Sequence, residues 1–289
     1  MKKDKIHIHW YPGHIAKAEK KLKEQLSLVD AVIEILDARI PLSSGYKNIA
    51  GLLKDKPRLI LFNKSDLADK TKLEAFAKKI ETESGFPVIL SDAKNSKDLN
   101  KIVKKVVELS EPRIQAIMQK GLLRRPARVM VVGMPNVGKS SIINKLTRSS
   151  KTKTGAKAGV TRQQQWVRIN PQLELLDTPG IIPMKQEDQT IALKLAFVNS
   201  ISENAYSNIA VANELLKILS EKYPETVRTY YNLTDESLID IENIAKSRNW
   251  IKTGGETDLE RTAIYILRDF REGKIGKFVL DDLSEEIEE

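Results

Sequence analysis

The sequence predicts an α/β domain with a mainly parallel sheet, followed by a small all-α domain. Short apolar strands alternate with amphipathic helices from residue 16 to residue 178, as in a parallel sheet that helices cover on both faces. A glycine-rich segment at 133–140 joins a strand to a helix within this region. After residue 187 the apolar residues keep helical spacing, and little suggests strands. We therefore expect one domain at 1–187 and a helical domain at 188–289.

The individual elements follow from hydrophobic periodicity and from the residues that end helices. Gly85 stands just past one helical segment and is expected to end it. Pro112 lies inside another and is expected either to break it or to start a second helix. Strands are expected at 31–38, 57–64, 86–91 and 126–133, with a strand pair at 164–170 and 172–178. Helices are expected at 16–29, 71–84, 97–120, 139–146, 188–201, 214–231, 236–250 and 258–273.

The composition restricts the classes of function. The chain has no cysteine, which excludes disulfides and thiolate metal sites and fits a reducing compartment. No apolar run approaches the length that spans a bilayer, and the first residues lack the apolar core of a signal peptide. We therefore expect a cytoplasmic protein that does not associate with a membrane.

The net charge of +9 is unevenly distributed. Residues 1–180 carry 35 Lys and Arg against 18 Asp and Glu, a net charge of +17. Residues 181–289 carry 13 against 21, a net charge of −8. A solvated basic surface accounts for this pattern, and so does a phosphate-rich partner such as nucleic acid.

The segment Gly133-Met-Pro-Asn-Val-Gly138-Lys139-Ser140 has the GxxxxGK[ST] pattern of a phosphate loop between a strand and a helix. The glycines let backbone N–H groups curl around phosphate oxygens, and the helix N-terminus favours an anion. We expect Lys139 to reach the β- and γ-phosphates as a catalytic charge and the Ser140 hydroxyl to bind Mg²⁺. The nucleotide contacts expected from this loop are Asn136, Val137, Gly138, Lys139, Ser140 and Ser141.

A second phosphate element, Asp177-Thr-Pro-Gly180, follows a strand-like segment 37 residues after Ser140. We expect Asp177 to hold Mg²⁺ through a water molecule and the Gly180 N–H to meet the γ-phosphate. Thr161, in the polar segment between the two, is the expected switch threonine that contacts Mg²⁺ and serves catalysis. Thr152 and Thr154 lie nearby as alternatives.

The segment Asn63-Lys64-Ser65-Asp66 ends an apolar strand and predicts guanine recognition. The Asp66 carboxylate can accept hydrogen bonds from the guanine N1–H and 2-amino group, which adenine does not offer, so a P-loop kinase or ATPase is disfavoured. Asn63 would reach the O6 or N7 side of the base, and Lys64 would lie along the ring. Ser91-Asp-Ala-Lys94, after the next strand, resembles a weaker guanine motif. The expected base contacts are Asn63, Lys64, Ser65, Asp66, Asp92 and Ala93.

The base-reading motif precedes the phosphate loop by about seventy residues, the reverse of the usual order in GTPases. A parallel sheet tolerates such a permutation when the new termini lie in a surface loop. The new opening follows Gly180, so the segment that senses the γ-phosphate runs directly into the helical domain. We hypothesise that the nucleotide state is transmitted to residues 188–289 through this connection.

The permuted order, with Asp37-Ala-Arg-Ile-Pro41 and Trp10-Tyr-Pro-Gly-His14, resembles the circularly permuted GTPases, and within them the bacterial ribosome biogenesis GTPase A (YlqF-type) group. The resemblance covers essentially the whole chain. It implies a cytoplasmic GTPase that binds GTP and GDP and helps mature the large ribosomal subunit. The implied partners are the precursor of that subunit and its rRNA, partly through the helical domain, and we expect a monomer.

The sequence gives no ordinary side chain for activating water. Ile181 follows Gly180 where many GTPases have a glutamine, and an aliphatic side chain cannot orient water. The resemblance implies that His14 orients the water and that Asn136 helps hold a K⁺ ion, although a histidine after Pro-Gly also fits a structural or RNA-facing role. Arg39 and Arg162 are weaker candidates for charge in the transition state.

Two functions from different classes remain. One is a GTPase whose slow hydrolysis is stimulated by the ribosomal particle. The other is a GTP-gated RNA-binding module with incidental hydrolysis, which Ile181 favours. In either case the helical domain offers basic residues and Trp250, which could stack on a base. The basic residues considered are Lys246, Arg248, Lys252, Arg268, Arg271, Lys274 and Lys277.

Overall fold

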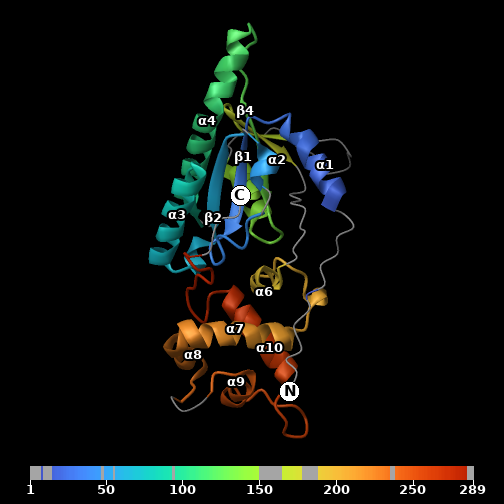
Figure 1. The fold of residues 1–289 in the computed structure, drawn as a ribbon, viewed down its shortest axis with the longest axis vertical. Coiled ribbons are helices and arrows are strands. Elements are labelled where there is room, and N and C mark those ends of the chain that lie inside the picture. Colours follow the sequence, from blue (N-terminus) through green and yellow to red (C-terminus); the bar gives the residue numbers. More distant parts are fainter. Residues whose placement is uncertain are drawn as a thin grey trace. The chain divides into compact units, whose positions relative to one another are not determined.

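The computed structural model describes residue 8 and residues 15–46, 49–54, 56–92, 95–149, 165–177, 188–234 and 238–284. The chain forms two compact units (Figure 1). The sheet unit comprises Pro12–Met184 and Asp281–Glu289, and the helical unit comprises Met1–Tyr11 and Lys185–Leu280. This division differs from the predicted one in both terminal segments. Ile8, which is buried, donates its N–H to Gln189 Oε1 at 3.1 Å in the helical unit.

A six-stranded sheet forms the centre of the sheet unit, in the order β3-β2-β1-β4-β6-β5. All neighbouring pairs are parallel except β5 with β6, which confirms the predicted mainly parallel sheet and the strand pair. The central strands β1 and β2 are buried along their whole length, as their nearly continuous apolar sequences require. The strands are β1 (Ala31–Asp37), β2 (Arg58–Asn63), β3 (Val88–Ser91), β4 (Ala127–Gly133), β5 (Gln165–Asn170) and β6 (Leu173–Asp177).

Helices lie on both sides of these strands, with α4 on one side and α1 and α2 on the other (Figure 1). The helix α3 begins after Asp69, whose side chain accepts a hydrogen bond from the Lys72 N–H. It ends as predicted at Gly85, which has a left-handed φ of 69°. The helices of this unit are α1 (Ile15–Leu26), α2 (Ile49–Leu53), α3 (Lys70–Ser84), α4 (Ser96–Gln119) and α5 (Lys139–Ser149), with a short 3₁₀ helix at Ser65–Leu67.

Pro112 lies inside α4, and the helix continues through it, so the expected break or restart is absent. Proline removes the hydrogen bond to the carbonyl four residues earlier, at Glu108, which is exposed and can bind water instead. The buried stripe of α4 runs uninterrupted past the proline, with Val106 on one side and Ile114 on the other. Packing of this stripe on the sheet therefore holds the helix together.

Polar residues end three neighbouring strands at the carboxyl edge of the sheet. Asp37 is in register with Asn63, and Asn63 with Ser91. Gly133, where the phosphate loop begins, is in register with Ile35 of β1. Ligands of open parallel sheets bind at this edge, so the fold gathers the predicted site from segments far apart in sequence.

The helical unit is built mainly of helices, as predicted. Side chains of α7 and α10 form much of its core, with Leu215, Leu219, Ile266 and Phe270 at most 1% exposed. Among the described residues, none of the helices combines the length and apolar character that a bilayer crossing requires. The helices are α6 (Gln189–Phe197), α7 (Asn208–Lys222), α8 (Pro224–Tyr231), α9 (Ile241–Ser247) and α10 (Leu259–Arg271), with a 3₁₀ helix at Glu203–Ala205.

Candidate nucleotide site

The phosphate loop connects β4 to α5 and packs directly on the ends of β1 and β2. Gly133 and Gly138 have φ angles of 153° and 100°, which glycine adopts more readily than other residues. A Cβ on Gly133 would lie 2.4 Å from the Ile35 carbonyl oxygen, and a Cβ on Gly138 would lie 2.1 Å from Asn63 Nδ2. A side chain at Gly133 would therefore push the loop away from β1, and one at Gly138 would push it away from the predicted base-reading segment.

Asn63 joins the base-reading segment to the phosphate loop. Its Nδ2 donates a hydrogen bond to the Val137 carbonyl oxygen at 2.7 Å. Its buried Oδ1 has no hydrogen-bond partner among the described residues, and neither has the buried Oγ of Ser91 on the adjacent strand. Because buried polar atoms are normally paired, two such atoms at neighbouring strand ends fit a polar planar ligand such as a nucleobase.

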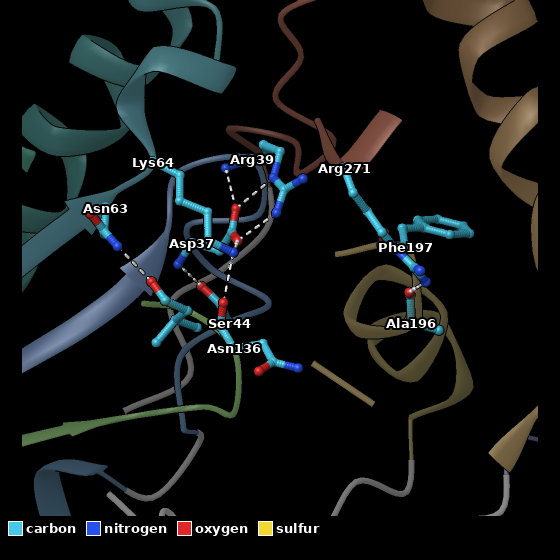
Figure 2. A network of polar contacts seen from close by, with 10 residues as sticks. Asp37, Arg39, Ser44, Asn63, Lys64, Asn136, Ala196, Phe197 and Arg271 are labelled. Carbon is cyan, nitrogen blue, oxygen red and sulfur yellow. Dashed lines mark hydrogen bonds and ion pairs between the residues drawn. The ribbon is translucent and has the colours of Figure 1, made fainter. Parts of the chain in front are cut away.

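Lys64 makes a second connection between the same two segments (Figure 2). Its backbone is left-handed, with a φ of 60°. Nζ donates to the Asn136 carbonyl oxygen at 2.7 Å and to Asp37 Oδ2 at 2.9 Å. Burial lowers the pKa of Lys64, and the Asp37 carboxylate opposes this shift. The lysine is thus held between the phosphate loop and the end of β1.

Asp37 is fully buried and forms ion pairs with both Lys64 and Arg39. Arg39 Nε donates to Oδ1 at 2.8 Å and Nη2 donates to Oδ2 at 2.7 Å, a bidentate pair. The Asp37 N–H donates to Ser44 Oγ at 2.9 Å. Burial acts to raise the pKa of Asp37, but the charges and hydrogen bonds of Arg39 and Lys64 outweigh it, so this pKa lies well below its usual range. Asp37 therefore stays ionised and fixes Lys64.

Lys139, the lysine predicted to bind phosphate, lies at the N-terminus of α5. Lys139 Nζ donates to the carbonyl oxygens of Gly133 and Met134, at 2.8 and 2.5 Å. Burial lowers the pKa of Lys139 to about 8. Ser140 and Ser141 are exposed in the first turn of the helix. An ammonium group, a helix N-terminus and two hydroxyl groups thus occupy one short stretch, a combination suited to binding a polyphosphate.

The other predicted residues divide into those that the structure describes and those that it does not. Ser65 and Asp66 lie in the 3₁₀ helix directly after Lys64. Asp92 follows β3, and its N–H donates to Asp98 Oδ2 at 3.3 Å. Asp177 ends β6, which neighbours β4 in parallel, but its side chain is not described. His14, Ala93, Thr161, Arg162, Gly180 and Ile181 lie outside the described residues.

Sequence reasoning did not find the role of Asp37 and Arg39. Both lie in the segment DARIP, and Arg39 is a sequence candidate for transition-state charge. In the structure, however, the guanidinium of Arg39 is hydrogen-bonded to Asp37. The available signal was an acidic residue at the end of a buried strand, beside the strand that carries Asn63 and Lys64. Parallel neighbours bring such strand ends together.

The sequence and fold are similar to those of known GTPases. Residues 128–247 match the family model described as 50S ribosome-binding GTPase. This range begins at β4 and leaves out residues 63–66, as the permuted order requires. Ribosome biogenesis GTPase A of Bacillus licheniformis is 40% identical over 93% of this chain and 96% of that protein. The protein of the same name from Priestia megaterium is 39% identical over 96% of this chain and 98% of its own.

Solved structures of YlqF have the same fold. The GDP-bound structure of TM YlqF is 25% identical, has a TM-score of 0.66, and is matched over 92% of this chain and 100% of that chain. GNP-bound YlqF from T. maritima is 26% identical, with a TM-score of 0.64 and the same coverage.

Proposed function

This chain belongs to the ribosome biogenesis GTPase A family, and from this premise we propose that it hydrolyses GTP to GDP and phosphate during maturation of the large ribosomal subunit. The observation that carries the proposal is the pair of hydrogen bonds from Asn63 and Lys64 to the phosphate loop. These bonds fix a guanine-reading segment beside a phosphate-binding segment, so one nucleotide can contact both.

The base and the phosphates would be held by different strand ends. Asp66 accepts from the guanine N1–H and 2-amino group, and the unpaired Oδ1 of Asn63 and Oγ of Ser91 lie at neighbouring strand ends. Ser65, Asp92 and Ala93 border the base. Val137, Gly138 and Ser141 belong to the phosphate loop and its helix and would surround the phosphates. Lys139 supplies positive charge where negative charge develops on the transferred phosphoryl group.

A test of this specificity uses Asp66→Asn. The carboxamide loses one acceptor for guanine and can donate to the 2-oxo group of xanthine. We expect this variant to lose most GTP hydrolysis and to gain XTP hydrolysis, measured as phosphate release with each nucleotide. Asp69→Asn, at the N-cap of α3, is the matched control and should leave the preference for GTP unchanged. Equal use of GTP by both variants would refute the assignment of Asp66.

The residues around the phosphate loop fit a Mg²⁺ ion, which would supply Lewis-acid stabilisation of the phosphates. Ser140 offers an exposed hydroxyl in the first turn of α5. Asp177 ends β6, the strand parallel to β4, so it reaches the same edge of the sheet. Oxygen donors of this kind suit Mg²⁺, with Thr161 as a further ligand and water between the ion and Asp177.

We further assign a K⁺ site to Asn136 and water orientation to His14. Asn136 is exposed on the phosphate loop, and an amide oxygen is a suitable K⁺ ligand. The role of His14 is supported by the resemblance of its segment to the family and by Ile181, whose aliphatic side chain cannot hydrogen-bond to water. Hydrolysis should therefore be faster in K⁺ than in Na⁺, and Asn136→Ala should remove this difference.

The helical unit offers a surface suited to RNA bases. Trp250 and Tyr265 lie with ring centroids 4.8 Å apart, and the exposed Arg268 lies over the Tyr265 ring at 4.1 Å. Arg261, also exposed, lies 5.6 Å from the same ring. Aromatic rings and guanidinium planes bind unstacked bases, and arginines also contact phosphates. This surface supports rRNA contact by the helical unit and is the observation that favours the GTP-gated RNA-binding module.

Several other basic residues considered for RNA binding have partners within the unit. Arg271 donates to the carbonyl oxygens of Phe197 and Ala196 and to the Tyr206 hydroxyl. Arg248 donates to the Tyr230 carbonyl oxygen. Lys246 and Lys274 pair with Glu242 and Glu272. Arg268 also lies 3.9 Å from Asp269 Oδ1, but it is exposed and lies over the Tyr265 ring, so we place the RNA contact on Arg261 and Arg268. We further propose that the protein acts as a cytoplasmic monomer.

The decisive experiment is GTP turnover in K⁺ buffer with and without purified large ribosomal subunits. A large rise in turnover is the expected outcome, and His14→Ala should abolish the rise while leaving GDP binding intact. No rise, together with GTP-dependent binding to the subunit, would replace the GTPase proposal by the RNA-binding module. Arg268→Ala should then weaken subunit binding without changing the intrinsic GTP turnover.

A further inference from the structure

The chain passes from the helical unit to the sheet unit between two consecutive residues, Leu280 and Asp281. Phe278 and Leu280 are buried, and the Tyr223 hydroxyl donates to the Val279 carbonyl oxygen at 3.3 Å. The next side chain, Asp281, is also buried, with 4% exposed. Asp281 is thus a buried residue at the point where the chain enters the sheet unit.

The Asp281 carboxylate holds the loop that follows β1. The N–H groups of Leu42 and Ser43 donate to Oδ2 at 2.7 and 3.0 Å. The Ser43 hydroxyl donates to Oδ1 at 2.6 Å. Three hydrogen bonds to one buried carboxylate, each charge-assisted, fix the position of this loop strongly. The contact joins residues about 240 positions apart in sequence.

The same loop leads to the nucleotide site. Ser44, next to Ser43, accepts the N–H of Asp37 on its Oγ. Asp37 holds Lys64 at 2.9 Å, and Lys64 in turn donates to the Asn136 carbonyl oxygen of the phosphate loop. A continuous series of short polar contacts and neighbouring residues thus runs from Asp281 to the phosphate loop (Figure 2 shows its part from Ser44 onward).

We propose that Asp281 is a positioning residue for guanine-nucleotide binding: it holds the loop at Leu42–Ser44, which orients Asp37 and through it Lys64. The inference rests on the proposed guanine site. Its physical basis is that loss of the Asp281 carboxylate leaves the buried N–H of Ser43 and the half-buried N–H of Leu42 unpaired and frees the loop that supports Asp37.

The test is GDP dissociation, followed by the fluorescence of a labelled GDP released from the purified full chain. We expect Asp281→Ala to speed up dissociation about tenfold. Asp282→Ala is the matched control, because Asp282 accepts from Ser284 and its removal should leave the rate unchanged. Lys64→Met should also speed up dissociation, and adding Asp281→Ala to it should have little further effect, since both act through Lys64.

The outcomes separate this inference from the proposed function. If the wild type binds no GDP, the guanine site itself is refuted. If the wild type binds GDP and Asp281→Ala releases it at the wild-type rate, the role of Asp281 is refuted. Additive effects of Asp281→Ala and Lys64→Met would assign Asp281 a general structural role and also overturn the inference. Should Asp281→Ala fail to fold, Ser44→Ala, which removes only the contact to the Asp37 N–H, must reproduce the faster release.

Discussion

Two buried carboxylates on β1 differ in how well their negative charges are matched. Asp37 has two cationic partners, and its pKa lies well below its usual range despite burial. Glu34 has Arg58 as its ion-pair partner, and burial outweighs that partner, so the pKa of Glu34 is raised. The two residues lie three positions apart in one strand and differ mainly in the charges that face them.

We expect Asp37→Asn to cost about 3–5 kcal/mol in the free energy of unfolding, because it leaves Arg39 and Lys64 without their buried counter-charge. Glu34→Gln should cost clearly less, since Arg58 keeps its contact with the Phe86 ring. Urea denaturation followed by circular dichroism measures both variants. Equal losses of unfolding free energy in the two variants would contradict the idea that Asp37 is better balanced by cations than Glu34.

Nucleotide affinity should depend on pH through Lys139. The pKa of this lysine is lowered to about 8 in the free protein, and a bound phosphate would raise it, so the charged form binds best. Affinity should be nearly constant below pH 8 and fall as the pH rises above it, by about tenfold between pH 7 and pH 9. GDP titration across this range measures the effect. In Lys139→Gln the fall in GDP affinity that comes from the lysine should disappear. A fall at higher pH that comes from deprotonation of guanine N1 should remain.

At the scale of elements, local sequence predicted most strands and helices and failed where distant packing decides. The sequences AVIEILD and LILFN were correctly predicted to form buried strands, because apolar and β-branched residues favour the central strands of a sheet. Helix α2 at Ile49–Leu53 was not predicted, since five residues carry too little periodicity. The continuous α4 was not predicted either, because the packing of Val106 and Ile114 on the sheet does not appear in the local pattern around Pro112.

Pro112→Ala should stabilise the sheet unit. The substitution restores the N–H that bonds to the Glu108 carbonyl, in a helix that already passes through this position. We expect a gain of about 1–3 kcal/mol in the free energy of unfolding, measured with urea. Lys104→Ala, an exposed change on the same helix, should stay within about 0.5 kcal/mol of wild type. A loss of stability in Pro112→Ala would contradict this expectation and would mean that the packing of α4 depends on the proline.

At the scale of the whole molecule, one passage from the sheet unit to the helical unit lies after Met184, between β6 and α6. We predict that residues 178–187 are cleaved by protease at different rates with GDP and with a non-hydrolysable GTP analogue, because they begin at the segment that the sequence predicts to sense the γ-phosphate. Mass spectrometry of the fragments locates the cuts. Identical patterns with both nucleotides would argue against transmission along this connection.

The sequence also predicted that the base-reading segment and the phosphate loop belong to one site, and parallel strand ends do bring Asn63, Lys64 and this loop into contact. It did not predict which unit holds the terminal segments. The burial of Asp281 could not be predicted, since a buried aspartate can be recognised only when its partners, here Leu42 and Ser43, are known. Contacts across 240 positions leave no periodic trace in the sequence.

The placement of the terminal segments has a consequence for synthesis on the ribosome. Domains usually fold as they emerge, the N-terminal one first. Here Ile8 can make its hydrogen bond only after Gln189 has been synthesised, and the loop after β1 can make its own only after Asp281 has been synthesised. Neither unit reaches its final set of contacts until nearly the whole chain has been translated, so a nascent chain stalled before residue 281 should hold guanine nucleotide less tightly than the released protein.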